Sequence, residues 1–142
     1  MPSRVEQIML HLLDILTVPA MASIPVASVF RSLDAAISSG LPALVIEEGN
    51  ESEPDLSVID FANRRLSVQV RVVIKGDQPY SLADEPMAEA FGRIVNDRTL
   101  SGLAIDLTEG STQRQRGMLE KPVGIITKNF LIQFETAQNS LS

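Results

Sequence analysis

The stretch that decides the fold is LSVQVRVVIK, residues 66–75. Apolar and mainly polar side chains alternate along it, and the apolar ones are Leu66, Val68, Val70, Val72 and Ile74. This period of two is the pattern of a β-strand. A strand so long and so rich in valine needs partners on both edges and a cover over its apolar face. We therefore place it at the centre of a sheet.

The amino-acid composition limits which classes of protein this chain can belong to. The 142 residues are 44% hydrophobic and 21% charged, which predicts one folded domain spanning residues 1–142 with a real core. Without cysteine and with a single histidine, the chain offers no thiolate metal site, no cysteine nucleophile and little imidazole chemistry. The net charge of -6 argues against a protein that wraps nucleic acid. No secretory signal or membrane-spanning run is recognisable, so we expect synthesis in the cytoplasm.

An amphipathic helix is predicted over residues 3–16. Ser3 and Glu6 have the spacing of a capping box at its start. Its apolar stripe consists of Val5, Ile8, Met9, Leu12 and Leu16. Leu10 points away from that stripe and is a candidate subunit contact. His11 lies at the border of the stripe with no partner at metal-ligand spacing, which is typical of a solvated or core-edge histidine.

Short strands are expected on both sides of the central one. After an irregular connector at 17–25, we predict strands at 26–31 and 41–48, with a loop or single helical turn at 34–40 between them. A further strand at 56–61 would turn at Asn63 and Arg64 and pair antiparallel with the central strand. Later strands are predicted to begin at 105–109 and to run over 123–137, and the tail at 138–142 is expected to fray.

Two loops of opposite charge stand out. The run 47–55 carries Glu47, Glu48, Glu51, Glu53 and Asp55, and we predict an acidic hairpin tip, because the glycine and closing glutamate of a calcium-binding EF-hand are not in place. The run 111–121 carries Arg114, Arg116 and Lys121, and we predict a long solvated hairpin loop.

A second helix is predicted between these loops, capped by Ser81 or Asp84 and ending near Asp97, with Pro86 in its first turn. Its buried stripe is Ala83, Met87, Ala90, Phe91, Ile94 and Val95. In the following TLSGLA, residues 99–104, Gly102 is expected to take a positive backbone angle. The fold class is therefore α+β: an antiparallel or mixed sheet of about six strands with two helices packed on one face.

No catalytic, metal or cofactor site is predicted. The glycines are scattered rather than clustered before a helix, so a phosphate-cradling loop is absent from the sequence. Asp60, Asp106 and Glu109 lie on or beside predicted strands and could do acid and base work, but surface charge is the simpler interpretation.

Three stretches carry a resemblance to a known family. They are LPALVIEEG at 41–49, the strand at 66–75, and the helix that runs into Asp97, followed by Thr99, Leu100, Gly102, Leu103, Asp106 and Leu107. Together with the order of the elements they resemble the tail terminator family of long-tailed bacteriophages and prophages, also described as tail completion or minor tail proteins. The likeness covers residues 4–136, although Ser101 stands where a second glycine is expected.

The resemblance implies a structural protein rather than an enzyme. It would form a homo-oligomeric ring, typically a hexamer, that caps the tail tube, ends its polymerisation and provides the head-joining surface. Its partners would be other copies of itself, the tail tube protein and the head–tail connector protein, with neither a cofactor nor a membrane involved. DNA would pass through the lumen without specific binding. The protein would be found in the host bacterial cytoplasm during assembly and then in the virion tail.

A closed ring needs two different complementary patches on each subunit. The candidate residues for contacts between subunits or with the tail tube are Leu10, Glu47, Glu48, Glu51, Glu53, Arg114, Arg116 and Lys121. Two alternatives stay open: a monomeric adaptor of the phage neck or tail, and a small cytoplasmic enzyme of α+β fold. Sequence alone also leaves open whether the isolated subunit is monomeric.

Overall fold

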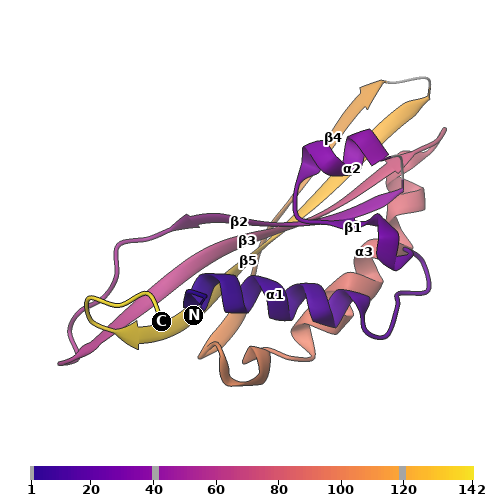
Figure 1. The fold of residues 1–142 in the computed structure, drawn as a ribbon. Coiled ribbons are helices and arrows are strands. Elements are labelled where there is room, and N and C mark those ends of the chain that lie inside the picture. The colour runs from indigo at the N-terminus through magenta and orange to yellow at the C-terminus, as the bar shows by residue number, and fades with distance from the viewer. Residues whose placement is uncertain (1, 40–41, 119–120) are drawn as a thin grey trace.

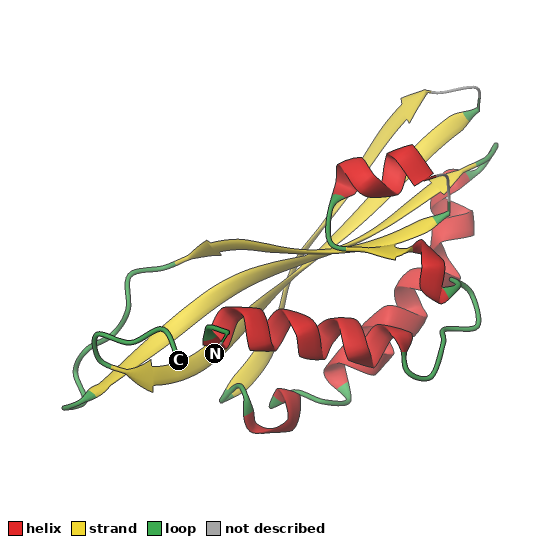
Figure 2. Ribbon diagram, in the orientation of Figure 1, coloured by secondary structure: helices red, strands yellow, loops and turns green. Residues whose placement is uncertain are grey.

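The computed structural model describes residues 2–39, 42–118 and 121–142. They form an α+β fold with one mixed five-stranded sheet, ordered β1-β2-β3-β5-β4, and three α-helices (Figures 1 and 2). The elements, including two short 3-10 helices labelled η, are α1 (Arg4–Thr17), η1 (Val26–Ser28), β1 (Val29–Phe30), α2 (Leu33–Ser39), β2 (Ala43–Glu51), β3 (Phe61–Lys75), α3 (Pro79–Val95), η2 (Leu100–Gly102), β4 (Asp106–Met118) and β5 (Pro122–Ala137).

The central position predicted for the 66–75 strand is confirmed. β3 lies between β2 and β5 and is antiparallel to both. Its pairing with β5 is continuous from Phe61 opposite Ala137 to Lys75 opposite Val123. Only β1 runs parallel to its neighbour, β2, through two residues. At a rise of about 3.3 Å per residue, the 15 residues of β3 make the sheet about 50 Å long.

The strand predicted at 56–61 is wrong. That stretch is a loop, and β3 begins at Phe61 and includes the expected turn residues Asn63 and Arg64. β3 extends back to Phe61 and Asp55 already pairs with Asn63, so residues 56–60 reverse the chain between these two positions. The sheet accordingly has five strands rather than about six.

Two helices cover one face of the sheet, as predicted. The helices α1 and α3 lie against the same face of the sheet (Figure 2). Their side chains pack on the alternate apolar residues of β3 and on those of β5 that share this face. The main buried members of this core are Ile8, Met9, Leu12, Leu16, Leu66, Val68, Val70, Val72, Ile94, Ile132 and Phe134. A third helix, α2, was expected as a loop or single turn and packs on the opposite face, where Ala36, Val45 and Val73 form a smaller cluster.

Local signals account for the ends of the helices. Ser3 caps α1 by accepting from the Glu6 backbone N–H at 3.2 Å, as predicted, but the Glu6 carboxylate bonds Arg31 instead of completing a capping box. α3 starts at Pro79, after Gln78 rather than Ser81 or Asp84, because proline suits the first helical position. Pro86 therefore lies inside the helix and not in its first turn. Gly102 has the expected positive φ, 89°.

The last hairpin differs from the expectation. Residues 111–118 belong to strand β4, which pairs with β5 up to Met118, so most of the predicted solvated loop is a strand; residues 119 and 120 lie outside the described part. The tail expected to fray is held by hydrogen bonds: the Arg4 backbone N–H donates to the Leu141 carbonyl at 2.7 Å, the Arg64 guanidinium donates to the Ser140 carbonyl at 3.3 Å, and the Gln138 backbone N–H donates to the Asp60 carbonyl at 2.9 Å.

Candidate functional site

Most of the candidate interface residues lie toward opposite ends of the sheet. Glu51 pairs with Leu66 at the end of β2, and Glu53 follows in the loop. Arg114 and Arg116 lie on β4 toward the other end, where Arg116 is opposite Gly124, and Lys121 follows in the β4–β5 connection. In Figure 1 the β2–β3 loop and the β4–β5 hairpin project at opposite extremities of the molecule. The structure therefore separates the acidic and basic candidates within one chain.

Glu47 and Glu48 already have partners within the chain. Glu47 is in close contact with Arg71 on β3. Glu48 accepts from Arg31 at 2.7 Å, and Arg31 also reaches Glu6 on α1 at 2.5 Å. The pKa of Arg31 is raised: burial, the largest single effect, lowers it, but the hydrogen bonds and charges of Glu6 and Glu48 together outweigh that. Both glutamates are thus engaged by arginines of the same chain, and Glu51 and Glu53 are the further exposed acidic candidates.

Leu10 belongs to neither end. It lies on the solvent side of α1 with 48% of its surface exposed, as predicted. The structure places it on the helix-covered side of the sheet, on α1. Arg114 and Arg116 of β4 lie on the same side, next to α3.

The β2–β3 loop carries an exposed apolar group that the sequence interpretation missed. We call residues 52–61 the tip loop. Its large apolar side chains Leu56, Val58, Ile59 and Phe61 are all exposed, Ile59 to 82%. The exposed carboxylate of Asp60 lies among them, and those of Glu53 and Asp55 precede them. Instead of the predicted strand, residues 56–60 form the turn between Asp55 and β3, and their large apolar side chains stay exposed.

Hydrogen bonds fix the backbone of the tip loop. Asp55 and Asn63 exchange two backbone hydrogen bonds of 2.8 and 2.9 Å. The Asp55 carboxylate accepts from the Ser57 backbone N–H at 2.9 Å, and this bond lowers the pKa of Asp55. From the C-terminal tail, the Gln138 side chain donates to the carbonyls of Val58 and Phe61 at 3.3 Å each. The apolar side chains are thus presented outward from a defined loop.

The opposite end carries an apolar groove of about 560 Å³ between α2 and the β4–β5 hairpin. Its apolar lining is Ile37, Met118, Val123 and Ile125, and its polar lining is Gln115, Arg116 and Gly117. Met118 is 71% exposed. The Arg116 guanidinium reaches the α3 side of the hairpin, where it lies 5.7 Å from the centre of the Tyr80 ring. The groove could not be anticipated because the segment containing Ile37 was expected to be a loop or single turn.

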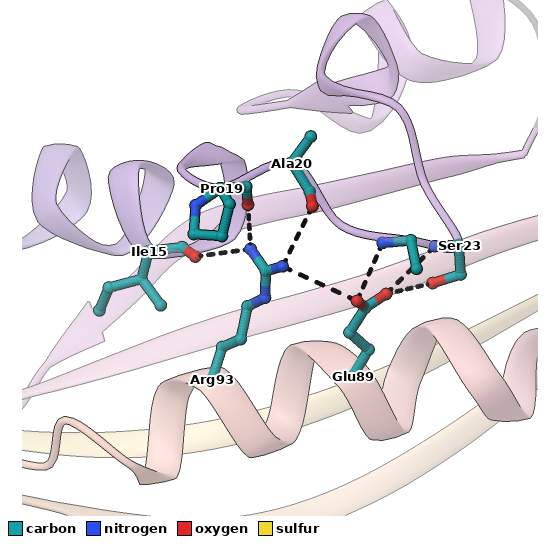
Figure 3. A network of polar contacts seen from close by, with 7 residues as sticks. Ile15, Pro19, Ala20, Ser23, Glu89 and Arg93 are labelled. Carbon is teal, nitrogen blue, oxygen red and sulfur yellow. Dashed lines mark hydrogen bonds and ion pairs between the residues drawn. The ribbon is translucent and has the colours of Figure 1, made fainter.

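A polar cluster holds the 17–25 connector against α3 (Figure 3). The Glu89 carboxylate accepts from the Ala22 backbone N–H at 2.9 Å and from the Ser23 hydroxyl at 2.6 Å. The Arg93 guanidinium donates to the carbonyls of Ile15, at 3.1 Å, and Ala20, at 3.2 Å. The Ser23 hydroxyl and then the Ala22 N–H lower the pKa of Glu89. These contacts satisfy backbone groups that an irregular segment leaves unpaired.

His11 has a partner that the sequence did not reveal. Its Nε2 lies 2.8 Å from a carboxylate oxygen of Asp97, 86 residues away, so the predicted core-edge histidine is part-buried and has a carboxylate partner distant in sequence. The same carboxylate accepts from the Ser101 backbone N–H at 3.1 Å. The His11 bond first, and the Ser101 bond with it, lower the pKa of Asp97. The pair joins α1 to the turn after α3.

The three carboxylates considered for acid and base work do not converge. Asp60 lies in the tip loop, Asp106 is bonded to Arg98 at 3.2 Å, and Glu109 contacts the buried Lys128. Within residues 2–39, 42–118 and 121–142, no three histidine or carboxylate side chains are grouped as metal ligands. None of the helices described in that part of the chain is long and apolar enough to cross a membrane.

No protein-family model matches this chain. In sequence, no curated protein matches it significantly.

Proposed function

We propose that this protein is a structural subunit of a phage or prophage tail, forming a ring that caps the tail tube, ends its polymerisation and presents the head-joining surface. The proposal combines the family resemblance of the sequence with the surfaces just described. Neighbouring copies, the tail tube protein and the head–tail connector protein are the proposed partners.

The observation that carries the proposal is the separation of two unlike ends on one elongated sheet. An acidic, apolar tip loop lies at one end and a basic hairpin beside an apolar groove lies at the other. A two-fold dimer uses the same patch on both subunits, whereas a ring uses two different patches joined head to tail. Unlike ends therefore favour a ring or an open chain of subunits over a symmetric dimer.

The charge balance agrees with a channel for DNA. The chain has 18 acidic and 12 basic residues. Carboxylates repel the phosphate backbone, whereas clustered lysine and arginine would bind it and retain the DNA. A ring built from this subunit would let DNA pass without gripping it.

The proposal is tested with growing tail tubes of the same phage or prophage. Purified protein is added while the tube protein polymerises, and tube length and tube ends are measured by negative-stain electron microscopy. We expect shorter tubes with an added ring at one end. Tubes of unchanged length with bare ends, at concentrations well above those of the tube ends, would overturn the proposal. Single subunits bound without a ring would instead support the adaptor alternative.

A charge variant with a matched control sharpens this test. Arg114→Glu reverses an exposed charge on the basic hairpin, and Arg98→Glu reverses an exposed charge near the start of β4, outside that hairpin. Both change the net charge equally. We expect R114E to weaken capping and R98E to leave it intact, since only the first lies at the end proposed to meet a partner.

A further inference from the structure

We infer that the tip loop of one copy docks into the apolar groove of a second copy, so that Ile59 and its apolar neighbours fill the space between α2 and the β4–β5 hairpin. This inference rests on the proposed ring and names the contact that would build it. The occupant of the groove is thus another copy of this chain.

The tip loop has the properties of an inserted element. Four large apolar side chains are exposed within six residues, which is unusual on a free surface and marks a contact site. The loop backbone is held by the Asp55–Asn63 pair and by Gln138, so little conformational freedom is lost on docking. A preformed apolar projection of this kind matches a preformed apolar recess.

The groove has the properties of the receiving element. Its apolar lining comes from three elements, with Ile37 on α2, Met118 on β4 and Val123 and Ile125 on β5. A cavity of roughly 150 Å³ holds a benzene-sized group. The groove, at about 560 Å³, has room for more than one apolar side chain.

A copy cannot fill its own groove. The tip loop joins β3 at the row of Phe61 and Ala137, whereas the groove lies near the row of Lys75 and Val123. These rows are fourteen residues apart, about 45 Å along the sheet. Both segments are tied into the same rigid sheet (Figure 1), so the two surfaces can meet only between molecules.

Charge favours the same pairing. Glu51, Glu53, Asp55 and Asp60 give the tip loop and its base an acidic character, with Arg65 as a nearby cation. The groove end carries the exposed Arg114, Arg116 and Lys121, with Arg114 and the Arg116 guanidinium on the α3 side of the hairpin and the groove on the α2 side. These charges therefore act on the approach of the acidic end of a second copy rather than lining the apolar contact, and like charges disfavour the approach of two tip loops or of two groove ends.

The absence of native cysteine makes a direct test simple. Two single variants, Ile59→Cys in the tip loop and Ile37→Cys in the groove, are purified separately, mixed and treated with a short bismaleimide cross-linker. We expect a covalent dimer in the mixture and little dimer from either variant alone, because the contact joins unlike surfaces. The double variant is expected to give a ladder of covalent oligomers.

A matched control places the second cysteine at Leu82, which is exposed on α3 at the same end of the molecule but on the other face of the sheet. The mixture of I59C with L82C is expected to give no more dimer than I59C alone. The readings are taken up to the highest soluble protein concentration. Absence of the I59C–I37C product at that concentration, or an equal yield from I59C alone, would overturn the inference.

Different results would overturn the proposed ring and the proposed contact between tip loop and groove. A ring seen by electron microscopy without the I59C–I37C product would leave the ring standing and overturn the loop-in-groove contact. The cross-linked product in open chains that never close or cap a tube would leave the contact standing and overturn the ring. As a second readout, Ile59→Asp is expected to weaken self-association by about tenfold or more, since burying an isoleucine contributes on that order.

Discussion

The buried Lys128 tests how much its ion pair with Glu109 contributes to the stability of the sheet. It lies on the core face of β5 and is only 9% exposed. Its ammonium contacts the Glu109 carboxylate, donates to the Thr112 hydroxyl at 3.0 Å and lies 5.7 Å from the centre of the Phe91 ring. Glu109→Gln would remove the countercharge and leave the ammonium shielded from water.

The magnitude follows from the exposure of the two partners. Breaking a fully buried ion pair costs about 3–5 kcal/mol. Glu109 is 56% exposed, so water screens the pair, and we expect E109Q to lower the free energy of unfolding by about 1–2 kcal/mol. Lys128→Met keeps the length of the side chain and needs no countercharge, so it should be neutral or stabilising by up to about 1 kcal/mol.

Urea unfolding of E109Q, K128M and the double variant measures these values. In the double variant, K128M should rescue the loss caused by E109Q, since no charge then remains buried. For a chain of this size, 1 kcal/mol corresponds to about 3 °C in Tm. If E109Q were neutral and K128M cost more than about 1 kcal/mol, Lys128 would not depend on Glu109 as its countercharge, and the reasoning would be refuted.

Three further substitutions test the packing, the connector and the first helix. Gly124→Ala is expected to cost about 1–3 kcal/mol in unfolding free energy, because its Cβ would lie 2.6 Å from the proline that starts α3; Gly117→Ala, whose Cβ meets no described atom within 4 Å, serves as the control. Glu89 has a lowered pKa in the folded protein, so its stabilisation is present above its unfolded pKa and is lost as the pH falls through the folded value. Glu89→Gln should therefore lower Tm at pH 7 and less so at acidic pH, and an unchanged gap across that range would contradict this. Ser3→Ala removes the cap hydrogen bond to Glu6 and should cost about 1 kcal/mol by chemical denaturation, whereas a neutral result would count against the cap.

The long strands could be predicted because one face of each packs on helices. Along 66–74 every second residue is buried, which is the pattern read from the sequence. The same reasoning gave the end of β5, where Ile132 and Phe134 share the core face. In such strands the alternation of apolar and polar side chains shows which face packs on the core.

In other segments the pattern of apolar and polar residues did not predict whether the chain forms a strand. The tip loop contains the apolar residues of a predicted strand, but its residues 56–60 form the turn between Asp55 and β3. Conversely, residues 111–116 are polar on both faces, and β5 nevertheless pairs with β4 from Thr112 to Met118. Backbone pairing is decided by neighbours distant in sequence, which composition does not report.

The candidate site was predictable only in its charges. Glu51, Glu53, Arg114 and Arg116 are exposed as expected, and the charge of the two loops is visible in the sequence. Predicting the groove would have required knowing that α2 lies beside the β4–β5 hairpin. Predicting the exposed tip loop would have required knowing that residues 56–61 do not form a strand. The pairing of His11 with Asp97 likewise depends on two segments 86 residues apart.

The most direct test of end-to-end assembly is the solution mass of the wild-type protein at several concentrations, by light scattering after size exclusion. The account predicts a mass that rises with concentration from the 15.4 kDa of one chain toward a closed ring, about 92 kDa for a hexamer. A mass that stays at one chain up to the highest soluble concentration, or that stops at a two-fold dimer, would contradict it.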